Sequence, residues 1–392
     1  MTSFPWHRTQ KLNSMENGAD VIPWYVNDPV VEEVSHFNLK VAKTREGAFR
    51  YTGAFIDLNA TRTTASGKTI GLTCDLKCPW CYNDVPHNRP TESLTLDQIK
   101  RIVGFVKSRG GKVVVHAGFG EPLMDPVFLP CLENSFREGL STVLYTNGSF
   151  ITAEVARALY EQDATVVIKR TSLDPRKQDE MVGSVKGYSD RMWRGFDHLL
   201  KAGFTTPRLA VDSLICNENL DEIPDMLRFC RDRDIIPYFE TFITTSPAVQ
   251  DSGYEPPSVA MIDSLFLELQ EIDRAEYNRE TRLVPGMRVY GVNPCRKYLS
   301  MFNVRCNGDV ALAPHTPALG NIEKQDLGKI LVPENNEIRR HLLQGCQCSA
   351  VTSVGLLAGC GASSTSATPS AHQAAPPDGA ERRLPSLRVV WK

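Results

Sequence analysis

Three cysteines stand close together in the segment Gly71-Leu-Thr-Cys-Asp-Leu-Lys-Cys-Pro-Trp-Cys-Tyr82. Cys74, Cys78 and Cys81 fall within eight residues, directly after a short strand-like stretch. Three thiolates so closely spaced in a tight loop can hold three corners of a cubane [4Fe-4S] cluster, which normally takes four protein thiolates. One iron is then open to a ligand that the protein does not supply.

A structural zinc site is the alternative interpretation of these cysteines. Zinc would need a fourth Cys or His, usually from a second pair at characteristic spacing. His87, six residues beyond Cys81, is the only nearby candidate, and no second cysteine pair follows before Cys295. The spacing therefore favours the iron-sulfur cluster over zinc.

The cysteine segment resembles the signature of the radical S-adenosylmethionine (radical SAM) superfamily, Cys-x3-Cys-x-aromatic-Cys, with Trp80 as the aromatic residue. A second resemblance lies in Lys112-Val-Val-Val-His-Ala-Gly-Phe-Gly-Glu-Pro122. The matching strand end of the superfamily is usually Gly-Gly-Glu-Pro, which binds the amino group of SAM. Phe119 replaces the first glycine of that pair. The segment keeps the other characteristic residues, which are Gly118, Gly120, Glu121 and Pro122.

The resemblance implies two cofactors, a [4Fe-4S] cluster and SAM bound to its open iron. Reduction of the SAM sulfonium then yields a 5′-deoxyadenosyl radical, which abstracts hydrogen from the substrate, while the protein orients the ligands and excludes competing reactions. The resemblance places Glu121 at the SAM amino group, Trp80 near the adenine and Ser172 at the ribose, with Asn147 as a further SAM contact. It assigns no catalytic side chain.

The rest of the chain alternates strand-like and helix-like segments, as in a parallel α/β fold. A capping box at Thr95 and Gln98 begins a helix that Gly110 and Gly111 end. We expect about six strand-helix units, which form a partial (β/α)6 barrel of the radical SAM type with a small C-terminal, cysteine-containing extension. The strands expected after the cysteines are 113–116, 142–146, 164–172, 208–215 and 235–243, and the helices between them are centred in 125–138, 152–161, 192–200 and 219–230.

The sequence divides into five predicted parts. These are an N-terminal extension (1–65), a radical SAM core (66–245), a linker with a closing helix (246–290), an extension (291–348) and a disordered tail (349–392) rich in Ala, Ser, Thr, Gly and Pro. The extension resembles SPASM or twitch domains, which carry auxiliary iron-sulfur clusters. It lacks a cysteine after its Gly-Asp-Val turn, so its cysteines either bind one auxiliary cluster or are buried thiols. They are Cys295, Cys306, Cys346, Cys348 and Cys360.

Composition limits the cellular setting and the partners. The 392 residues are 42% hydrophobic and carry a net charge of −2, without the basic footprint that nucleic-acid binding needs. We expect neither a signal peptide nor a membrane span. An odd number of cysteines, 11, favours reduced thiols and metal ligation in the cytoplasm over a disulfide framework.

Three functions fit these features. The favoured one is a radical SAM enzyme that modifies a small molecule or a peptide and takes electrons from a donor such as flavodoxin or ferredoxin. The alternatives are an activase that installs a glycyl radical in a partner protein and a non-catalytic iron-sulfur protein. The first 65 residues lack the helices of a winged-helix peptide-binding domain, which favours a small-molecule substrate.

Overall fold

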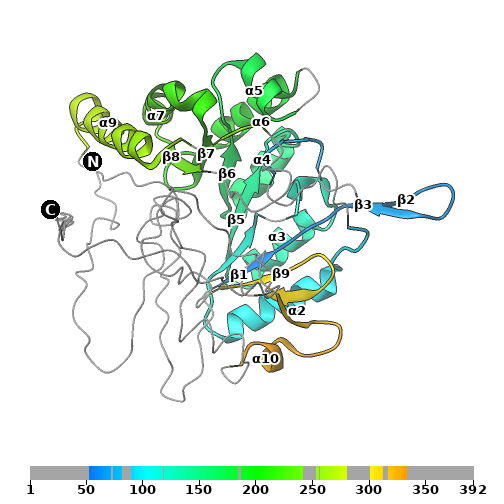
Figure 1. The fold of residues 1–392 in the computed structure, drawn as a ribbon. Coiled ribbons are helices and arrows are strands. Elements are labelled where there is room, and N and C mark those ends of the chain that lie inside the picture. Colours follow the sequence, from blue (N-terminus) through cyan, green and yellow to red (C-terminus); the bar gives the residue numbers. More distant parts are fainter. Residues whose placement is uncertain are drawn as a thin grey trace, which may run out of the picture. The chain divides into compact units, whose positions relative to one another are not determined.

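The computed structural model describes residues 53–71, 74–81, 90–117, 119–183, 187–241, 253–255, 257–279, 301–311 and 317–332. All of them belong to one compact unit, Asp20–Gly361. Among the described residues, the main sheet has nine strands in the order β11-β10-β9-β1-β4-β5-β6-β7-β8. Strands β5 to β8 follow one another across it (Figure 1). The parallel strands are β1 (Gly53–Ile56), β4 (Val113–His116), β5 (Ser141–Thr146), β6 (Thr165–Lys169), β7 (Leu209–Ile215), β8 (Ile236–Thr241) and β9 (Met301–Val304).

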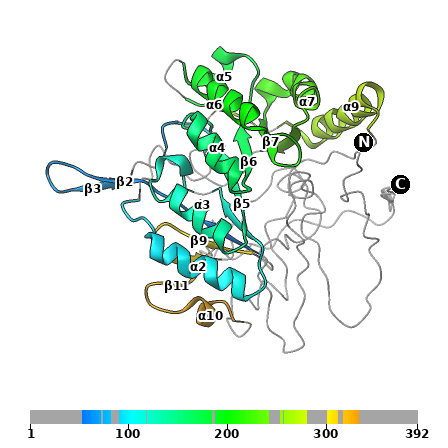
Figure 2. The same cartoon turned by 180° about the vertical axis from the view of Figure 1, so that it is seen from behind.

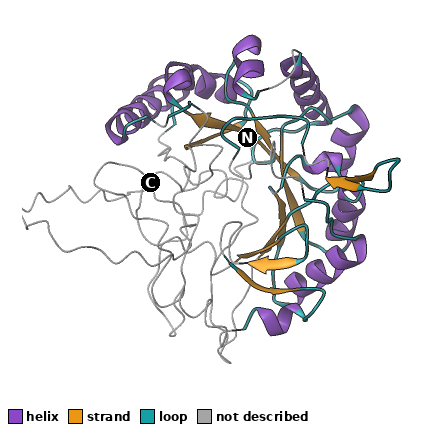
Figure 3. Cartoon of the chain, turned by 45° about the vertical axis from the view of Figure 1, so that its right-hand side comes forward, coloured by secondary structure: helices purple, strands orange, loops and turns teal. Residues whose placement is uncertain are grey.

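Helices cover the outer face of this curved sheet (Figure 3). In the view from behind, α2, α3, α4 and α6 lie over the strands (Figure 2). The helices are α2 (Leu96–Ser108), α3 (Phe128–Arg137), α4 (Ala153–Glu161), α5 (Pro175–Met181), α6 (Tyr188–Ala202), α7 (Ile223–Arg231), α9 (Val259–Tyr277) and α10 (Leu327–Ile330), with short 3-10 helices η2 (Pro122–Met124) and η3 (Asn217–Glu222).

Both faces of the parallel sheet are apolar, as expected for strands buried on two sides. One row of side chains packs under the helices and includes Val114, Val166 and Val211. The other row forms a separate cluster on the inner face of the sheet. The inner cluster contains Val113, Val115, Val143, Val167, Ala210, Ile236, Tyr238 and Met301. Period-two alternation along each strand separates these two rows.

Local sequence signals correspond well to the observed elements. The capping box at the start of α2 is confirmed, because Thr95 and Gln98 make both of its reciprocal contacts. Gly203 ends α6 with a φ of 99°. The expected 164–172 strand is shorter than predicted, since β6 ends at Lys169.

The first strand of the barrel is not, as the sequence suggests, the strand directly before the cysteines. The strand directly before the cysteines, β3 (Thr69–Gly71), pairs with β2 (Thr61–Thr63) in an antiparallel hairpin outside the main sheet. The first parallel strand is instead β1, so the six-stranded partial barrel consists of β1 and β4 to β8. The barrel fold is therefore confirmed with a different first strand.

Strand β9 adds a seventh parallel strand, beside β1 and far from it in sequence. Asn303 of β9 donates a hydrogen bond of 3.2 Å to the buried carboxylate of Asp57, and the Asp57 N–H donates to the Val304 carbonyl at 2.9 Å. Strands β10 (Asp309–Ala311) and β11 (Ala318–Asn321) then continue the sheet in antiparallel order. This part of the extension thus belongs to the main sheet.

Helix α9 lies within 246–290, where the sequence predicts a closing helix. It packs on α7 through a buried ion pair, in which Arg231 donates to Asp273 at 2.8 and 2.7 Å. A planar guanidinium and a carboxylate make a bidentate pair of this kind. Of the helices in the described residues, none is long and apolar enough to cross a bilayer.

Candidate functional site

The cysteine loop rests against the C-terminal end of α5. The Lys77 N–H donates to the Val182 carbonyl at 3.2 Å, and the Cys81 N–H donates to the Cys78 carbonyl at 3.1 Å. Gly183 has a φ of 56°, and a Cβ at this position would lie 2.3 Å from the Lys77 carbonyl oxygen. Only glycine therefore allows this close approach of α5 to the loop.

The three thiols of this loop lie within electrostatic range of one another. None of them is in a disulfide, and each is half-buried. Burial, together with the charges of Glu121, Asp75 and Cys81, raises the pKa of Cys74 to about 12. Burial and the charges of Cys74 and Cys81 raise the pKa of Cys78. Three mutually close sulfur atoms are the donor set that an iron-sulfur cluster uses.

The described residues do not distinguish zinc from an iron-sulfur cluster. Among them, no three or more His, Cys, Asp or Glu side chains are arranged as ligands of a single metal ion, and this includes the three loop cysteines. His87, the fourth ligand considered for zinc, lies outside the described residues.

Glu121 lies in the turn that follows β4, where its side chain caps η2. Its Oε1 accepts hydrogen bonds from Leu123 N–H at 3.1 Å and Thr146 Oγ1 at 2.7 Å, and its Oε2 accepts one from Asn147 N–H at 2.7 Å. Burial outweighs these three bonds and raises the pKa of Glu121 to about 7. A carboxylate has about four lone-pair sites, so Oε2 can still accept from a ligand ammonium.

Backbone conformation at this turn is consistent with the predicted SAM-binding segment. Gly120 has a φ of 122°, a conformation that residues with a Cβ rarely adopt. Gly118, the other predicted glycine, lies outside the described residues. The peptide chain beside Glu121 therefore needs a glycine at position 120.

Asn147 connects the cysteine loop with Glu121. Its side-chain amide donates to Asp75 Oδ1 at 2.7 Å and to Cys74 Sγ at 3.8 Å, while its backbone N–H holds Glu121. Three of the sequence-predicted groups, the cysteines, Glu121 and Asn147, therefore meet at one place. The role of Asn147 as a direct SAM contact stays a prediction.

Ser172 is fully buried, and its hydroxyl already has protein partners. It donates to Glu222 Oε2 at 2.5 Å and accepts from the Asp174 N–H at 3.1 Å. Glu222 also pairs with Lys177 on α5. These contacts fix the turn between β6 and α5, and the predicted contact of Ser172 with a ribose stays a prediction.

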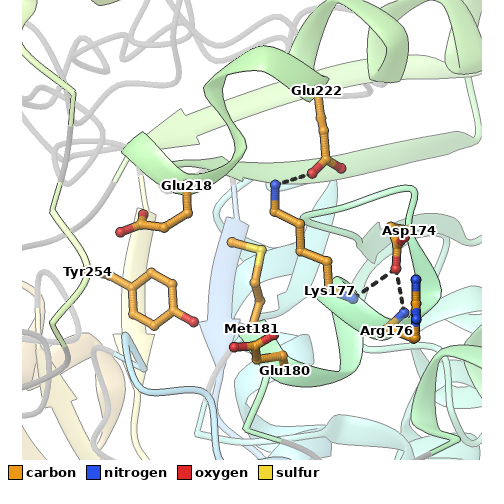
Figure 4. A pocket seen from close by; sticks show the side chains of 8 residues that line it. All are labelled: Asp174, Arg176, Lys177, Glu180, Met181, Glu218, Glu222 and Tyr254. Carbon is orange, nitrogen blue, oxygen red and sulfur yellow. Dashed lines mark hydrogen bonds and ion pairs between the residues drawn. The ribbon is translucent and has the colours of Figure 1, made fainter.

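A hollow of about 620 Å³ lies beside this turn (Figure 4). Figure 4 shows side chains from α5, from η3 and from the segment of Tyr254 around it. Tyr254 contacts Trp80 edge to face, with ring centroids 4.8 Å apart, and both pack with Met181. Trp80, the aromatic residue of the cysteine segment, thus packs behind two lining residues of this hollow. Its lining consists of Asp174, Arg176, Lys177, Glu180, Met181, Glu218, Glu222 and Tyr254.

A charged trio on the inner face of the sheet was missed by the sequence analysis. Lys169 ends β6 and pairs with Asp212 of β7 and, at 2.8 Å, with Glu240 of β8. The carboxylates are buried, with 0% and 6% of their side chains exposed, whereas 47% of the Lys169 side chain is exposed. Burial disfavours the ammonium, but the two carboxylates outweigh it and raise the pKa of Lys169.

Alternation along the strands could have identified this trio. Each charged residue stands two positions after an inner-face residue, so Lys169 follows Val167 and Asp212 follows Ala210. Burial raises the pKa of Cys78, and the charge of Lys169 opposes this rise in part. The Lys169 ammonium therefore lies within electrostatic range of the cysteine loop. The trio therefore lies near the cysteine loop.

The predicted auxiliary ligands are only partly described. Cys306 is buried after β9, and burial with the charges of Asp57 and Glu92 raises its pKa to about 12. The four other candidates lie outside the described residues: Cys295, Cys346, Cys348 and Cys360.

Comparison with known proteins gives a family match for the middle of the chain. Residues 69–230 match the family described as the radical SAM superfamily, and this segment contains the cysteine loop and Glu121. Members of that superfamily are enzymes that use a [4Fe-4S] cluster and SAM. The three thiols and the buried, hydrogen-bonded Glu121 fit these two groups, because they offer sulfur donors for iron and a carboxylate for an ammonium.

The chain is similar to several characterised proteins over part of their length. It is 26% identical to the AdoMet-dependent heme synthase of Methanosarcina barkeri, over 54% of this chain and 60% of that protein. It is 30% identical to the Fe-coproporphyrin III synthase of the same organism, over 38% of this chain and 37% of that protein. It is 25% identical to the PqqA peptide cyclase of Bradyrhizobium diazoefficiens, over 41% of each chain.

Solved structures support the fold. The chain superposes on Streptococcus suis SuiB bound to precursor peptide SuiA with a TM-score of 0.59 and 16% identity, covering 73% of this chain and 66% of that one. It superposes on anSMEcpe with bound AdoMet and a peptide with a TM-score of 0.55 and 14% identity, covering 76% of this chain and 83% of that one. These similarities confirm the partial barrel.

Proposed function

We propose that this protein is a radical SAM enzyme that abstracts hydrogen from a small-molecule or peptide substrate bound on the inner face of its sheet. The observation that carries the proposal is that Cys74, one of three half-buried thiols in a single short loop, lies within electrostatic range of the buried carboxylate of Glu121, with Asn147 bonded to both. A protein that kept an iron-sulfur cluster only as structure would not need that carboxylate.

Each group of the chain has a defined task in this proposal. Cys74, Cys78 and Cys81 hold the cluster, and Glu121 accepts hydrogen bonds from the ammonium of SAM. When bound, the two cofactors supply reductive cleavage of SAM and the 5′-deoxyadenosyl radical. Trp80, which packs against Tyr254, provides an apolar surface for the adenine.

The substrate is proposed to contact the charged trio on the inner face. Lys169 uses two of its three N–H donors on Asp212 and Glu240 and has a half-exposed side chain, so the third can donate to a substrate oxygen. Burying the two carboxylates of Asp212 and Glu240 is costly compared with an apolar surface of the same shape. The residues two positions earlier on the same strands are apolar, so packing alone does not require charged residues here. A contact that orients the substrate would explain their presence.

The names of the relatives suggest two substrate classes for a first test. They include a heme synthase and a peptide cyclase, which supports both a tetrapyrrole and a peptide as candidates. We propose an electron donor such as flavodoxin or ferredoxin and, in the extension, one auxiliary cluster that includes Cys306. Activation of a partner protein by a glycyl radical is the alternative. It would leave the cysteines of the extension, such as Cys306, without a role.

The test uses full-length protein reconstituted without oxygen. With dithionite and SAM, it should release 5′-deoxyadenosine even without substrate, and release should increase with iron coproporphyrin III or a PqqA peptide if either resembles the natural substrate. A protein that binds iron at the three cysteines yet never forms 5′-deoxyadenosine would contradict the proposed activity. The Glu121→Ala variant is the matched control, because it keeps the cysteines and loses the SAM-binding carboxylate.

A further inference from the structure

Every polar group of Asn147 has a partner in the protein. The backbone N–H donates to Glu121 Oε2 at 2.7 Å, and the backbone carbonyl accepts from the Tyr188 hydroxyl at 2.7 Å. The side-chain nitrogen donates to Asp75 Oδ1 at 2.7 Å and lies 3.8 Å from Cys74 Sγ. Asn147 is also buried. Asn147 therefore contacts the cysteine loop through its side chain and the Glu121 carboxylate through its backbone.

The neighbours of Asn147 fix which end of its amide faces the sulfur. The side-chain oxygen accepts from the Ser149 N–H at 2.9 Å, so the NH2 group points the opposite way. Asp75 can only accept hydrogen bonds, and Ser149 Oγ donates to its other oxygen at 2.8 Å. Arg191 lies 3.9 Å from the same carboxylate. Asp75 therefore holds one amide hydrogen and leaves the second directed at Cys74.

Hydrogen bonds to cluster sulfurs are a known means by which proteins tune iron-sulfur clusters. Cys74 Sγ accepts one from the backbone N–H of Leu76 at 3.4 Å and a second from the Asn147 amide. A donor stabilises the more negative, reduced cluster and so raises its reduction potential. The Asn147 donor belongs to a side chain, so a substitution removes it without altering the peptide bond that holds Glu121.

We propose that Asn147 is a positioning residue that sets the reduction potential of the cluster through its amide hydrogen bond to Cys74, with Asp75 aiming that amide. The inference rests on the proposed function, since it requires the cluster on Cys74. The same residue orients Glu121 through its backbone. The loop that binds the cluster and the carboxylate that binds SAM are therefore aligned by one short segment after β5.

The test compares Asn147→Ala with Ser149→Ala in full-length, reconstituted protein. Asn147→Ala removes the donor to sulfur, whereas Ser149→Ala removes a different bond to Asp75 and keeps that donor. We expect a more negative midpoint potential in an EPR-monitored titration for Asn147→Ala and an unchanged potential for Ser149→Ala. Ser149→Ala should also bind SAM nearly as the wild type does, because the Asn147 N–H and Thr146 still hold Glu121.

A second substitution protects the test against a folding defect. Asn147→Asp keeps the shape and the acceptor for Ser149 N–H, loses both amide donors and adds a negative charge, so its potential should fall further than that of Asn147→Ala. An unchanged potential in a folded, four-iron variant, or an equal shift in Ser149→Ala, overturns the inference. A wild-type protein without a cluster on these cysteines would instead refute the proposed function.

Discussion

Substitution of Glu121 by Gln should weaken SAM binding strongly. The change removes a charge-assisted hydrogen bond to the SAM ammonium, an interaction that contributes about 1.5 to 3 kcal/mol. Because each 1.4 kcal/mol changes a dissociation constant tenfold, the loss corresponds to roughly 10- to 100-fold in affinity. Glutamine also fits the site poorly, because both carboxylate oxygens accept from the protein and a side-chain NH2 would face one of those donors.

The same carboxylate predicts how SAM binding depends on pH. Burial raises the pKa of Glu121 to about 7 in the protein without SAM. The protonated carboxyl has no charge for the ammonium, so wild-type affinity should decrease as the pH falls below about 7, by roughly tenfold per pH unit. Glu121→Gln has no such group and should bind weakly with little pH dependence over this range.

Isothermal titration calorimetry on reconstituted protein measures both effects. The control is Glu92→Gln, which changes a carboxylate that is not among the Glu121 contacts and should leave SAM affinity unchanged. Wild-type affinity that stays constant between about pH 6 and 8, or a Gln variant that binds SAM as tightly as the wild type, would refute the assignment of Glu121.

Three further predictions address the cluster, the substrate contact and stability. Replacing Cys74, Cys78 and Cys81 by Ala should remove about four bound irons per chain and the absorption near roughly 400 nm, and an undiminished iron content would contradict the assignment. Lys169→Met should lose substrate modification in a product assay yet still release 5′-deoxyadenosine without substrate; loss of both would instead indicate a cofactor or folding defect. Asp273→Ala removes the bidentate carboxylate partner of a buried guanidinium and should lower the free energy of unfolding by about 3 to 5 kcal/mol in thermal or urea denaturation. The exposed pair on the same helix is the control, since Arg274→Ala should cost about 0 to 1 kcal/mol, and equal losses would contradict the buried-pair argument.

Features encoded by neighbouring residues could be predicted from the sequence. The capping box of Thr95 and Gln98 depends on residues three apart, and the glycine that ends α6 follows its apolar face directly. The cysteine loop and the Gly120-Glu121 turn are contiguous motifs. Parallel strands bring their carboxyl ends to one edge, so the meeting of these motifs followed from the predicted order of strands and helices.

Contacts between distant segments could not be predicted in the same way. Strand β9 is four residues long and has no periodicity that assigns it to β1. Ser172 has an ordinary strand-end sequence, and only the fold reveals that Glu222 accepts its hydroxyl hydrogen. The Lys169 trio draws one residue from each of three strands, so no single segment contains its signal.

The pairing of β9 with β1 affects how the chain can be assembled. Gly53 lies opposite Met301, so about 250 residues separate two strands that are hydrogen-bonded neighbours. During synthesis β1 leaves the ribosome early, but one of its edges has no partner until residues 301–304 follow. An unpaired strand edge promotes association between chains, and distant pairings form slowly. A fragment that ends at residue 245 would keep all three loop cysteines and still expose the edge of β1, so such fragments are expected to aggregate.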